Sequence, residues 1–206
     1  MSNDLNSVKM DSVDRPYHHG DLRAALIAAA EAVIVERGVD GFSLRETARR
    51  AGVSPAAPGH HFKDARGLLT AVAARIFQAF GDALEAGAQG PDRVARLHGQ
   101  GIAYVRFALA NPAKFDLLWR KALIDPADPA YKAAGERAFR LLDQVVRGDG
   151  GAETDAPAEV APSIAAWSIV HGFARLAMDG QFGTELGAAE RAADALLPHV
   201  LKHLNV

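Results

Sequence analysis

Apolar residues recur every three or four positions along this chain, and that spacing restricts it to helical folds. Leu22, Leu26, Ala29 and Val33 lie four, three and four residues apart, so they form one face of a helix. No segment of the sequence alternates apolar and polar residues as a half-buried strand does. Alanine, the residue with the highest helix propensity, occurs 42 times among the 206 residues. We therefore predict an all-α fold.

The spacing predicts nine helices, four of which begin at or near a proline, where a missing N–H costs little. They are expected at 21–37, 43–51, 54–61, 65–88, 91–110, 112–122, 128–148, 158–181 and 186–204. We interpret residues 1–14 as a mobile tail and residues 148–157, which are rich in glycine, as a flexible connector. Three short helices within residues 15–64 predict a small head, and residues 65–206 predict a larger helical body.

Composition excludes several classes of protein. The chain has no cysteine, which excludes disulfides, cysteine-ligated metal sites and a thiol nucleophile. The polar residues 1–14 do not have the apolar core of a signal peptide. The longest strongly apolar run, residues 24–30, is far shorter than the roughly 20 residues needed to cross a bilayer. We therefore expect a cytoplasmic protein with no membrane partner.

The net charge of −2 hides an uneven distribution. Residues 15–75 carry nine basic and six acidic side chains, together with four histidines. Residues 76–206 carry thirteen basic and sixteen acidic side chains. A basic head on an acidic body favours a polyanionic partner at the head.

The segment 42–55 has the spacing of two short helices joined by a tight turn. Ser43 and Glu46 can form a capping box, and Gly52 permits the turn. Ser54 can cap a second helix whose first residue is a proline. With basic residues around it, this pattern favours a helix-turn-helix that binds double-stranded DNA, whereas a helical hairpin inside a core is the structural alternative.

A longer ordered set of residues surrounds this segment and suggests a family. The set is Gly38, Gly41-Phe42-Ser43-Leu44, Ala48-Arg49-Arg50-Ala51-Gly52-Val53-Ser54, His61-Phe62-Lys63-Asp64 and Leu68-Leu69. Residues 20–75 thereby resemble the tetracycline-repressor (TetR) family of bacterial transcriptional regulators. The segment Trp167-Ser168-Ile169-Val170-His171-Gly172 is similar to the Trp-x-x-x-His-Gly segment in the ligand domains of some members.

The resemblance implies a homodimer whose first three helices bind operator DNA. The remaining helices would bind a small effector and hold the two subunits together. Most members of the family repress transcription, and effector binding releases them from DNA.

We expect the DNA contacts to lie in and around the two short helices. Helix N-termini and cations bind phosphates, and small apolar side chains contact thymine methyl groups. The candidate residues are Ser43, Arg45, Ser54, Pro55, Ala56, Ala57, His60, His61 and Lys63. Few of them can hydrogen-bond to a base, so DNA shape is expected to contribute to specificity.

The second short helix departs from the family pattern at Gly59. Many relatives carry an aromatic residue there, usually tyrosine, that contacts a phosphate. Pro58 would remove a helical hydrogen bond, and Gly59 costs about 1 kcal/mol relative to alanine. We predict a short or distorted recognition helix, in which His60 partly replaces the missing contact. The alternative function is a helical sensor or interaction protein with weak or lost DNA binding.

Aromatic residues concentrate in the body, where each can belong either to the core or to a pocket. The candidate effector pocket comprises Phe80, Phe107, Phe115, Trp119, Trp167 and His171. His171 lies one helical turn after Trp167 and is either a core histidine or a hydrogen-bond partner for the effector. No cation accompanies this cluster, so we expect an apolar or aromatic effector. The helix at 65–88 is long enough to connect the pocket to the head.

The last two predicted helices carry a surplus of apolar residues. We interpret the surplus as a two-fold interface in which the helices of two subunits form a four-helix bundle. The candidate interface residues are Ile169, Leu176, Leu197, Val200 and Leu201.

An enzyme is the main competing class, and the sequence gives it little support. There is no Gly-x-Ser-x-Gly motif and no phosphate-binding glycine loop. His199 and His203 are spaced as metal ligands on a helix can be, but no third ligand is evident. We expect no enzymatic activity, no cofactor and no metal.

Overall fold

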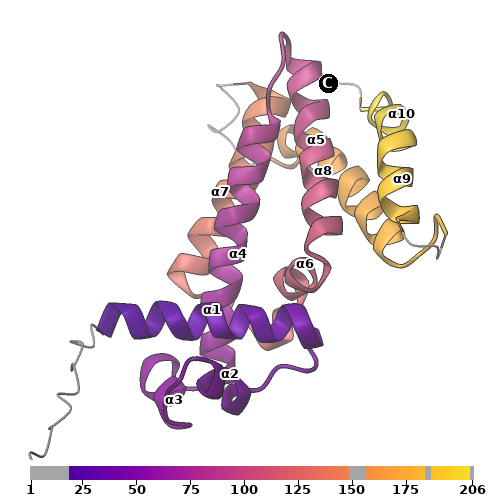
Figure 1. Ribbon diagram of the computed structural model, residues 1–206. Helices are drawn as coiled ribbons and strands as arrows, with labels where there is room; N and C mark the ends of the chain where they lie inside the picture. The colour runs from indigo at the N-terminus through magenta and orange to yellow at the C-terminus, as the bar shows by residue number, and fades with distance from the viewer. Residues whose placement is uncertain (1–18, 149–155, 184–186, 205–206) are drawn as a thin grey trace, which may run out of the picture.

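The computed structural model describes residues 19–148, 156–183 and 187–204, with side chains from residue 22 onward. These residues form α-helices and one 3₁₀ helix, with no strand among them (Figure 1). The all-α prediction is confirmed. The predicted mobile tail and most of the predicted connector lie outside the described residues.

Three helices form the head of the molecule, which comprises α1 (His19–Arg37), α2 (Leu44–Arg50) and α3 (Ala57–Phe62). The predicted apolar face of α1 turns inward, because Leu26 and Val33 are fully buried. Phe62 closes the head core from α3, and the guanidinium of Arg23 lies 5.1 Å from the centre of its ring. The buried apolar residues of the head belong to the same cluster as those of the body, so the two cores are continuous.

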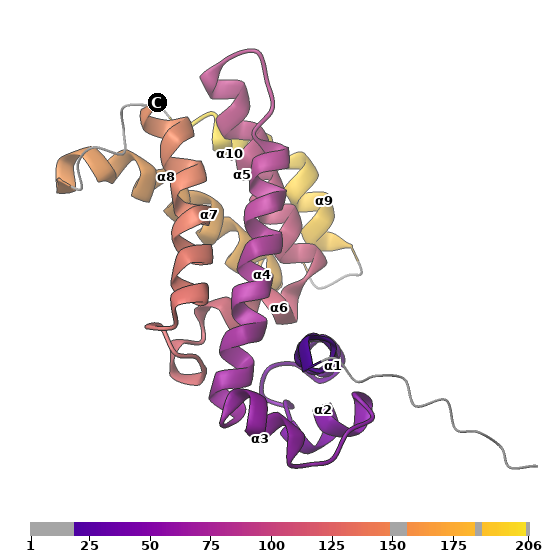
Figure 2. The ribbon, with the colours of Figure 1, turned by 90° about the vertical axis from the view of Figure 1, so that its left-hand side faces the viewer.

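The body begins with the long helix α4 and continues through six further α-helices. They are α4 (Ala65–Gly87), α5 (Arg93–Ala110), α6 (Pro112–Trp119), α7 (Pro129–Arg147), α8 (Pro157–Met178), α9 (Ala188–Ala195) and α10 (Leu197–Leu201), with η1 (Lys121–Leu123) after α6. Figures 1 and 2 show α4 running from the head along the body between α5 and α7, while α9 and α10 lie on the outer side near α5.

Helix α4 is long and apolar enough to span a membrane when length and composition alone are considered. Most of that stretch is buried inside the protein. Leu68, Val72 and Phe80 are among its core residues. The apolar character of α4 is therefore explained by its central position.

The observed helices differ from the predicted ones at two prolines. The last predicted helix is divided into α9 and α10 at Leu196, because Pro198 lies in the first turn of α10 and cannot continue the hydrogen bonds of α9. The helix predicted at 54–61 begins three residues later, and Pro58 occupies its first turn.

Candidate functional site

The N-terminus of α2 is capped by Ser43, as the spacing predicts. The Ser43 Oγ accepts a hydrogen bond from the Glu46 N–H at 3.4 Å. The carboxylate of Glu46 does not complete the capping box; it binds Arg49 and Arg50 instead. Gly52 follows the helix with a φ of 69°, so it makes the turn that leads to α3.

The N-terminus of α3 differs from the prediction. Its N-cap is Ala56, which makes no side-chain capping bond, so Ser54 does not cap the helix and Pro55 is not its first residue. Pro58 lies within the first turn, where the missing N–H would have no helical partner in any case. The proline therefore starts this helix and breaks no hydrogen bond in it. The prediction of a short helix is confirmed, because α3 has only six residues.

A strained turn at Lys63 joins α3 to α4. Lys63 has φ 67° and ψ −57°, and it is the one non-glycine residue with positive φ in the described part of the chain. The Asp64 N–H donates to the Phe62 carbonyl at 2.8 Å, which closes a γ-turn of the strained kind. Asp64 then caps α4 by accepting from the Gly67 N–H at 2.9 Å. This corner fixes the direction of α3 relative to α4.

The residues expected to contact DNA gather at the end of the molecule formed by α2 and α3 (Figure 1). Arg45, Ser54, Pro55, Ala56, His60 and Lys63 are exposed, whereas Ser43, Ala57 and His61 are half-buried. The structure brings all nine to one region of the head, although Ser54, Pro55 and Ala56 precede α3 and Lys63 follows it.

Two of the three arginines of α2 are paired with carboxylates of the head. Glu46 accepts two hydrogen bonds from Arg49 and one from Arg50, each at 2.8 Å, and these bonds lower the pKa of Glu46 to about 2. Glu36 on α1 also pairs with Arg50, and Arg37 lies 3.4 Å from Glu46. Three cations of the head are thus engaged within the protein, whereas Arg45 has no ion-pair partner among the described residues.

Helix α6 connects the body to the head through two ion pairs. The Lys114 Nζ lies 2.5 Å from a carboxylate oxygen of Glu31 on α1. Arg120, directly after α6, pairs with Asp40 beyond the end of α1. Local spacing does not predict this junction, since its partners are about 80 residues apart in the chain.

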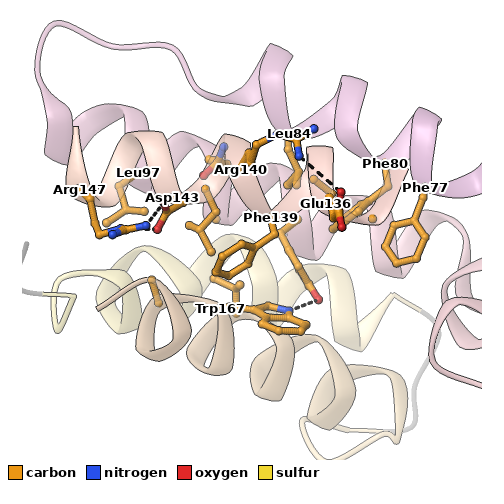
Figure 3. Close-up of a pocket in the computed structure, with 18 of the residues that line it drawn as sticks. Phe77, Phe80, Leu84, Leu97, Glu136, Phe139, Arg140, Asp143, Arg147 and Trp167 are labelled. Carbon is orange, nitrogen blue, oxygen red and sulfur yellow. Dashed lines mark hydrogen bonds and ion pairs between the residues drawn. The ribbon is translucent and has the colours of Figure 1, made fainter. Parts of the chain in front are cut away.

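A cavity of about 560 Å³ lies inside the body between α4, α5, α7 and α8 (Figure 3). Its size falls within the range typical of small-molecule sites. Figure 3 shows Phe77 and Phe80 at one end, Asp143 and Arg147 at the other, and Phe139 and Trp167 between them.

Three of the six residues predicted for the pocket line this cavity, namely Phe80, Trp119 and Trp167. Phe115 is fully buried and is not among the lining residues. Phe107 instead lines a separate hollow of about 170 Å³ beside Glu31 and Lys114. The prediction is corrected for Phe107 and Phe115, because helical spacing does not show which side of a buried ring faces empty space.

His171 also lies outside the lining, one hydrogen bond away from it. Its Nδ1 is 2.8 Å from the Tyr104 Oη, and the Trp167 Nε1–H donates to the same oxygen at 3.2 Å. One hydrogen bond therefore joins the Tyr104 Oη and the His171 Nδ1, and its direction depends on the tautomer of the imidazole ring. Burial lowers the pKa of His171, an effect that Arg175 reinforces, and burial raises the pKa of Tyr104. Tyr104 lines the cavity although it is not among the residues predicted for the pocket.

The far end of the cavity holds a buried ion pair. The Arg147 Nε donates to Asp143 at 2.7 Å, and the Ser163 Oγ donates to the same carboxylate oxygen at 2.7 Å. Burial alone would raise the pKa of Asp143, but the hydrogen bonds from Arg147 and Ser163 outweigh it and lower the pKa. This carboxylate is therefore ionised and fully engaged at neutral pH.

The residues predicted for a dimer interface divide into two groups. Leu197 and Leu201 are fully buried within the subunit, so they belong to its core and cannot contact a partner. Leu176 is 48% exposed, and Ile169 and Val200 are half-buried. Apolar side chains pack inward from α10 because this short helix contacts α5.

Among the described residues, no three histidine, aspartate or glutamate side chains lie close enough to hold a metal ion.

Comparisons with known proteins match both parts of the chain. Residues 26–72 match the family model of bacterial regulatory proteins of the tetR family, and residues 97–200 match that of the tetracyclin repressor-like C-terminal domain. The structure of a protein with unknown function from Rhodococcus sp. RHA1 is 34% identical, with a TM-score of 0.68, over 90% of this chain and 98% of that chain.

Two more distant structures share the fold. The TetR family transcriptional regulator PfmR from Thermus thermophilus is 20% identical, with a TM-score of 0.61, over 88% of this chain and 99% of that chain. A bacterial regulatory protein in the tetR family from Rhodococcus RHA1 is 18% identical, with a TM-score of 0.64, over 89% of this chain and 97% of that chain. No match is found among curated proteins.

Proposed function

This chain belongs to the tetR family of bacterial regulatory proteins, and we propose that it is a homodimeric repressor that an apolar or aromatic effector releases from operator DNA. As a member of that family it is a transcription regulator and not an enzyme. Repression, the effector and the dimer are the parts of this proposal that experiments must test.

The observation that carries the proposal is the physical link between the cavity and the head. Trp119 lines the cavity at the end of α6, and the next residue, Arg120, pairs with Asp40 of the head. Lys114 on the same helix pairs with Glu31 of α1. A ligand that displaces Trp119 would therefore shift the contacts that hold the head in place.

Helix α4 supplies a second link. It contributes Phe77, Phe80 and Leu84 to the cavity, and its first turn is capped directly after the strained corner that ends α3. The two heads of a dimer must fit DNA half-sites about 34–36 Å apart. A small tilt of α4 in each subunit would therefore disturb the contacts of both heads with DNA.

The proposed DNA surface consists of the exposed residues of α2, α3 and the turn between them. Arg45 and Lys63 are exposed cations on it, whereas Arg49 and Arg50 are already paired with carboxylates. We expect moderate affinity with a clear dependence on salt, because phosphate contacts release counterions.

The proposed dimer interface uses the exposed apolar side chains of α8 and the segment that follows α9. Ile164, Leu176 and Leu196 are between 41% and 48% exposed, so their side chains are available to a partner. Burying them against the same surface of a second copy would form a two-fold bundle.

The first test is binding to DNA taken from upstream of the protein's own gene, followed by fluorescence anisotropy at increasing salt. We expect saturable binding that prefers this DNA over a scrambled sequence and weakens as salt rises. Lys63→Ala should weaken it, and Lys132→Ala, an exposed residue on α7, serves as the control. Equal binding to both sequences would contradict an operator-binding role.

The second test addresses the link through α6. In the double variant Lys114→Ala and Arg120→Ala, ligand binding in the cavity should persist while ligand-induced release from DNA is reduced. Release that is unchanged in this variant would show that the ion pairs do not transmit the signal.

A second function is favoured by the arginine network of the head. Since Glu36 and Glu46 engage three of its arginines, few cations are left for phosphates. A cytoplasmic sensor that has lost most of its DNA affinity fits that observation, and the first test separates it from a repressor.

A further inference from the structure

The cavity is lined by aromatic rings that leave flat apolar surface for a ligand. Trp119 and Trp167, the two tryptophans of the sequence, both line it, with ring centres 5.6 Å apart. Phe139 lies 6.3 Å from Trp167, and Phe77 lies 6.0 Å from Trp119. At these separations the rings pack against one another, and the surfaces that they turn toward the cavity suit an aromatic ligand.

Two buried polar atoms of the lining residues lack a hydrogen-bond partner among the described residues. They are the Gln100 Oε1, an acceptor, and the Trp119 Nε1–H, a donor. A third such atom, the His98 Nε2, belongs to a residue outside the lining. Both residues line the cavity, although the two atoms themselves have almost no surface that a water molecule could reach. Buried polar atoms in folded proteins are nearly always paired, so a small side-chain rotation that turned these two atoms toward the cavity would let a ligand pair with both.

The orientation of the Gln100 side-chain amide is fixed by the hydrogen bond that its nitrogen makes. Its Nε2 donates to the Leu141 carbonyl at 3.2 Å, and a carbonyl can only accept. The amide therefore cannot be reversed without losing that bond, and the oxygen is the atom left free. Gln100 is 2% exposed, so bulk water does not compensate for the missing partner.

The charged groups of the lining are engaged with one another. Asp143 is bound by Arg147 and Ser163, and Arg140 lies 3.7 Å from Glu136. The Tyr104 hydroxyl is shared between Trp167 and His171. A charged ligand would have to break one of these arrangements to find a counterion, and an unpaired buried charge is costly.

We propose that the cavity binds an uncharged aromatic molecule that donates a hydrogen bond to the Gln100 Oε1 and accepts one from the Trp119 Nε1–H. A phenol or amine group would meet Gln100, and a carbonyl or ether oxygen would meet Trp119. That this molecule is also the effector rests on the proposed function, whereas its binding does not.

Matched naphthalenes test the two hydrogen bonds separately by isothermal titration calorimetry. The probes are 2-naphthol, which can donate to Gln100, 2-acetylnaphthalene, which can only accept, and the anion 2-naphthoate. The variants are Gln100→Leu and Trp119→Phe, which each remove one partner and keep much of the side-chain volume. Gln144→Leu, at an exposed position of α7 outside the lining, is the matched control.

We expect a crossed pattern, in which each variant weakens the binding of one neutral probe and leaves that of the other nearly unchanged. Gln100→Leu should weaken 2-naphthol about five- to tenfold and leave 2-acetylnaphthalene within about twofold, since one neutral hydrogen bond is lost. Trp119→Phe should weaken 2-acetylnaphthalene and spare 2-naphthol. The control should change neither, and 2-naphthoate should bind the unaltered protein more weakly than both neutral probes.

Three outcomes would overturn the proposal: equal losses for both neutral probes in each variant, tightest binding of 2-naphthoate, or no binding of any probe up to its solubility limit. If Gln100→Leu fails to fold, the proposal is still tested by the effect of Trp119→Phe and by the order in which the three probes bind the unaltered protein. Release of operator DNA is measured in parallel. The crossed pattern without release would refute the effector role alone, whereas release without the crossed pattern would refute this ligand class alone.

Discussion

The head and the body of this protein use their charged residues in opposite ways. In the head, Glu36 and Glu46 gather three arginines at the surface, where ion pairs contribute little to stability and are screened by salt. In the body, Asp143 is 6% exposed and is satisfied by Arg147 and Ser163. Ionic strength should therefore act mainly on the head, whereas the body should respond to the fit of a neutral ligand.

The largest expected difference is between two leucines of the body. Leu197→Asp places a carboxylate at a fully buried position and should prevent folding or lower the free energy of unfolding by several kcal/mol, roughly 3 or more. Leu176→Asp lies at a half-exposed position and should give a folded monomer. Circular dichroism and size-exclusion chromatography report the two effects. A folded, monomeric Leu197→Asp would show that this residue faces a partner after all.

Shortening one buried side chain in the head and one in the body tests whether the two regions unfold together. Phe115→Ala in the body should cost about 3–5 kcal/mol, and Leu26→Ala in the head about 2–5 kcal/mol, since both side chains are fully buried. If α4 couples the regions, each variant should shift a single thermal transition. Calorimetry showing two transitions, with only one shifted by each variant, would mean that the head is an independent unit.

A smaller effect is expected at the strained corner of the head. Lys63→Gly should relieve about 1 kcal/mol of strain, because glycine adopts positive φ freely, whereas Lys63→Ala should keep the strain. Both variants remove the cation and should weaken DNA binding alike. Urea unfolding separates them, and equal stability of the two variants would argue against strain at this turn.

The smallest change in stability is expected at Glu46. Its pKa is lowered from 4.5 to about 2, so the carboxylate stabilises the folded state above about pH 4.5 and loses that contribution as the pH falls towards 2. Glu46→Gln should flatten this part of the pH dependence and free Arg49 for phosphates, whereas Arg50 keeps its ion pair with Glu36. We expect tighter DNA binding with a steeper salt dependence. Unchanged affinity, measured by anisotropy, would mean that Arg49 does not face DNA.

Sequence reasoning predicted the helices well where local signals agree. The cap at Ser43, the turn at Gly52 and the long α4 all follow from short-range spacing. It was less accurate at Pro58, which lies in the first turn of α3 instead of breaking that helix, and at Pro198, where one predicted helix is divided into α9 and α10. A proline disfavours continuation from the preceding turn, yet α8 continues through Pro162, so a proline alone does not fix where a helix begins or ends.

The candidate cavity was predicted less well than the fold. Helical spacing brought Phe80, Trp119 and Trp167 to the correct region. It could not separate them from Phe115, because a ring in a full core and a ring beside a cavity obey the same spacing. Gln100 was missed for another reason: its role depends on a hydrogen bond to Leu141, which lies on another helix.

The sequence by itself determined that this chain is helical, that its first third carries a helix-turn-helix, and that it belongs with the TetR regulators. These properties depend on periodicity, capping and an ordered motif, all of which are local. Only the tertiary structure decided which arginines are paired, which leucines are core, and that α6 joins the cavity to the head. Those properties depend on contacts between residues far apart in the chain, and local sequence patterns do not predict such contacts.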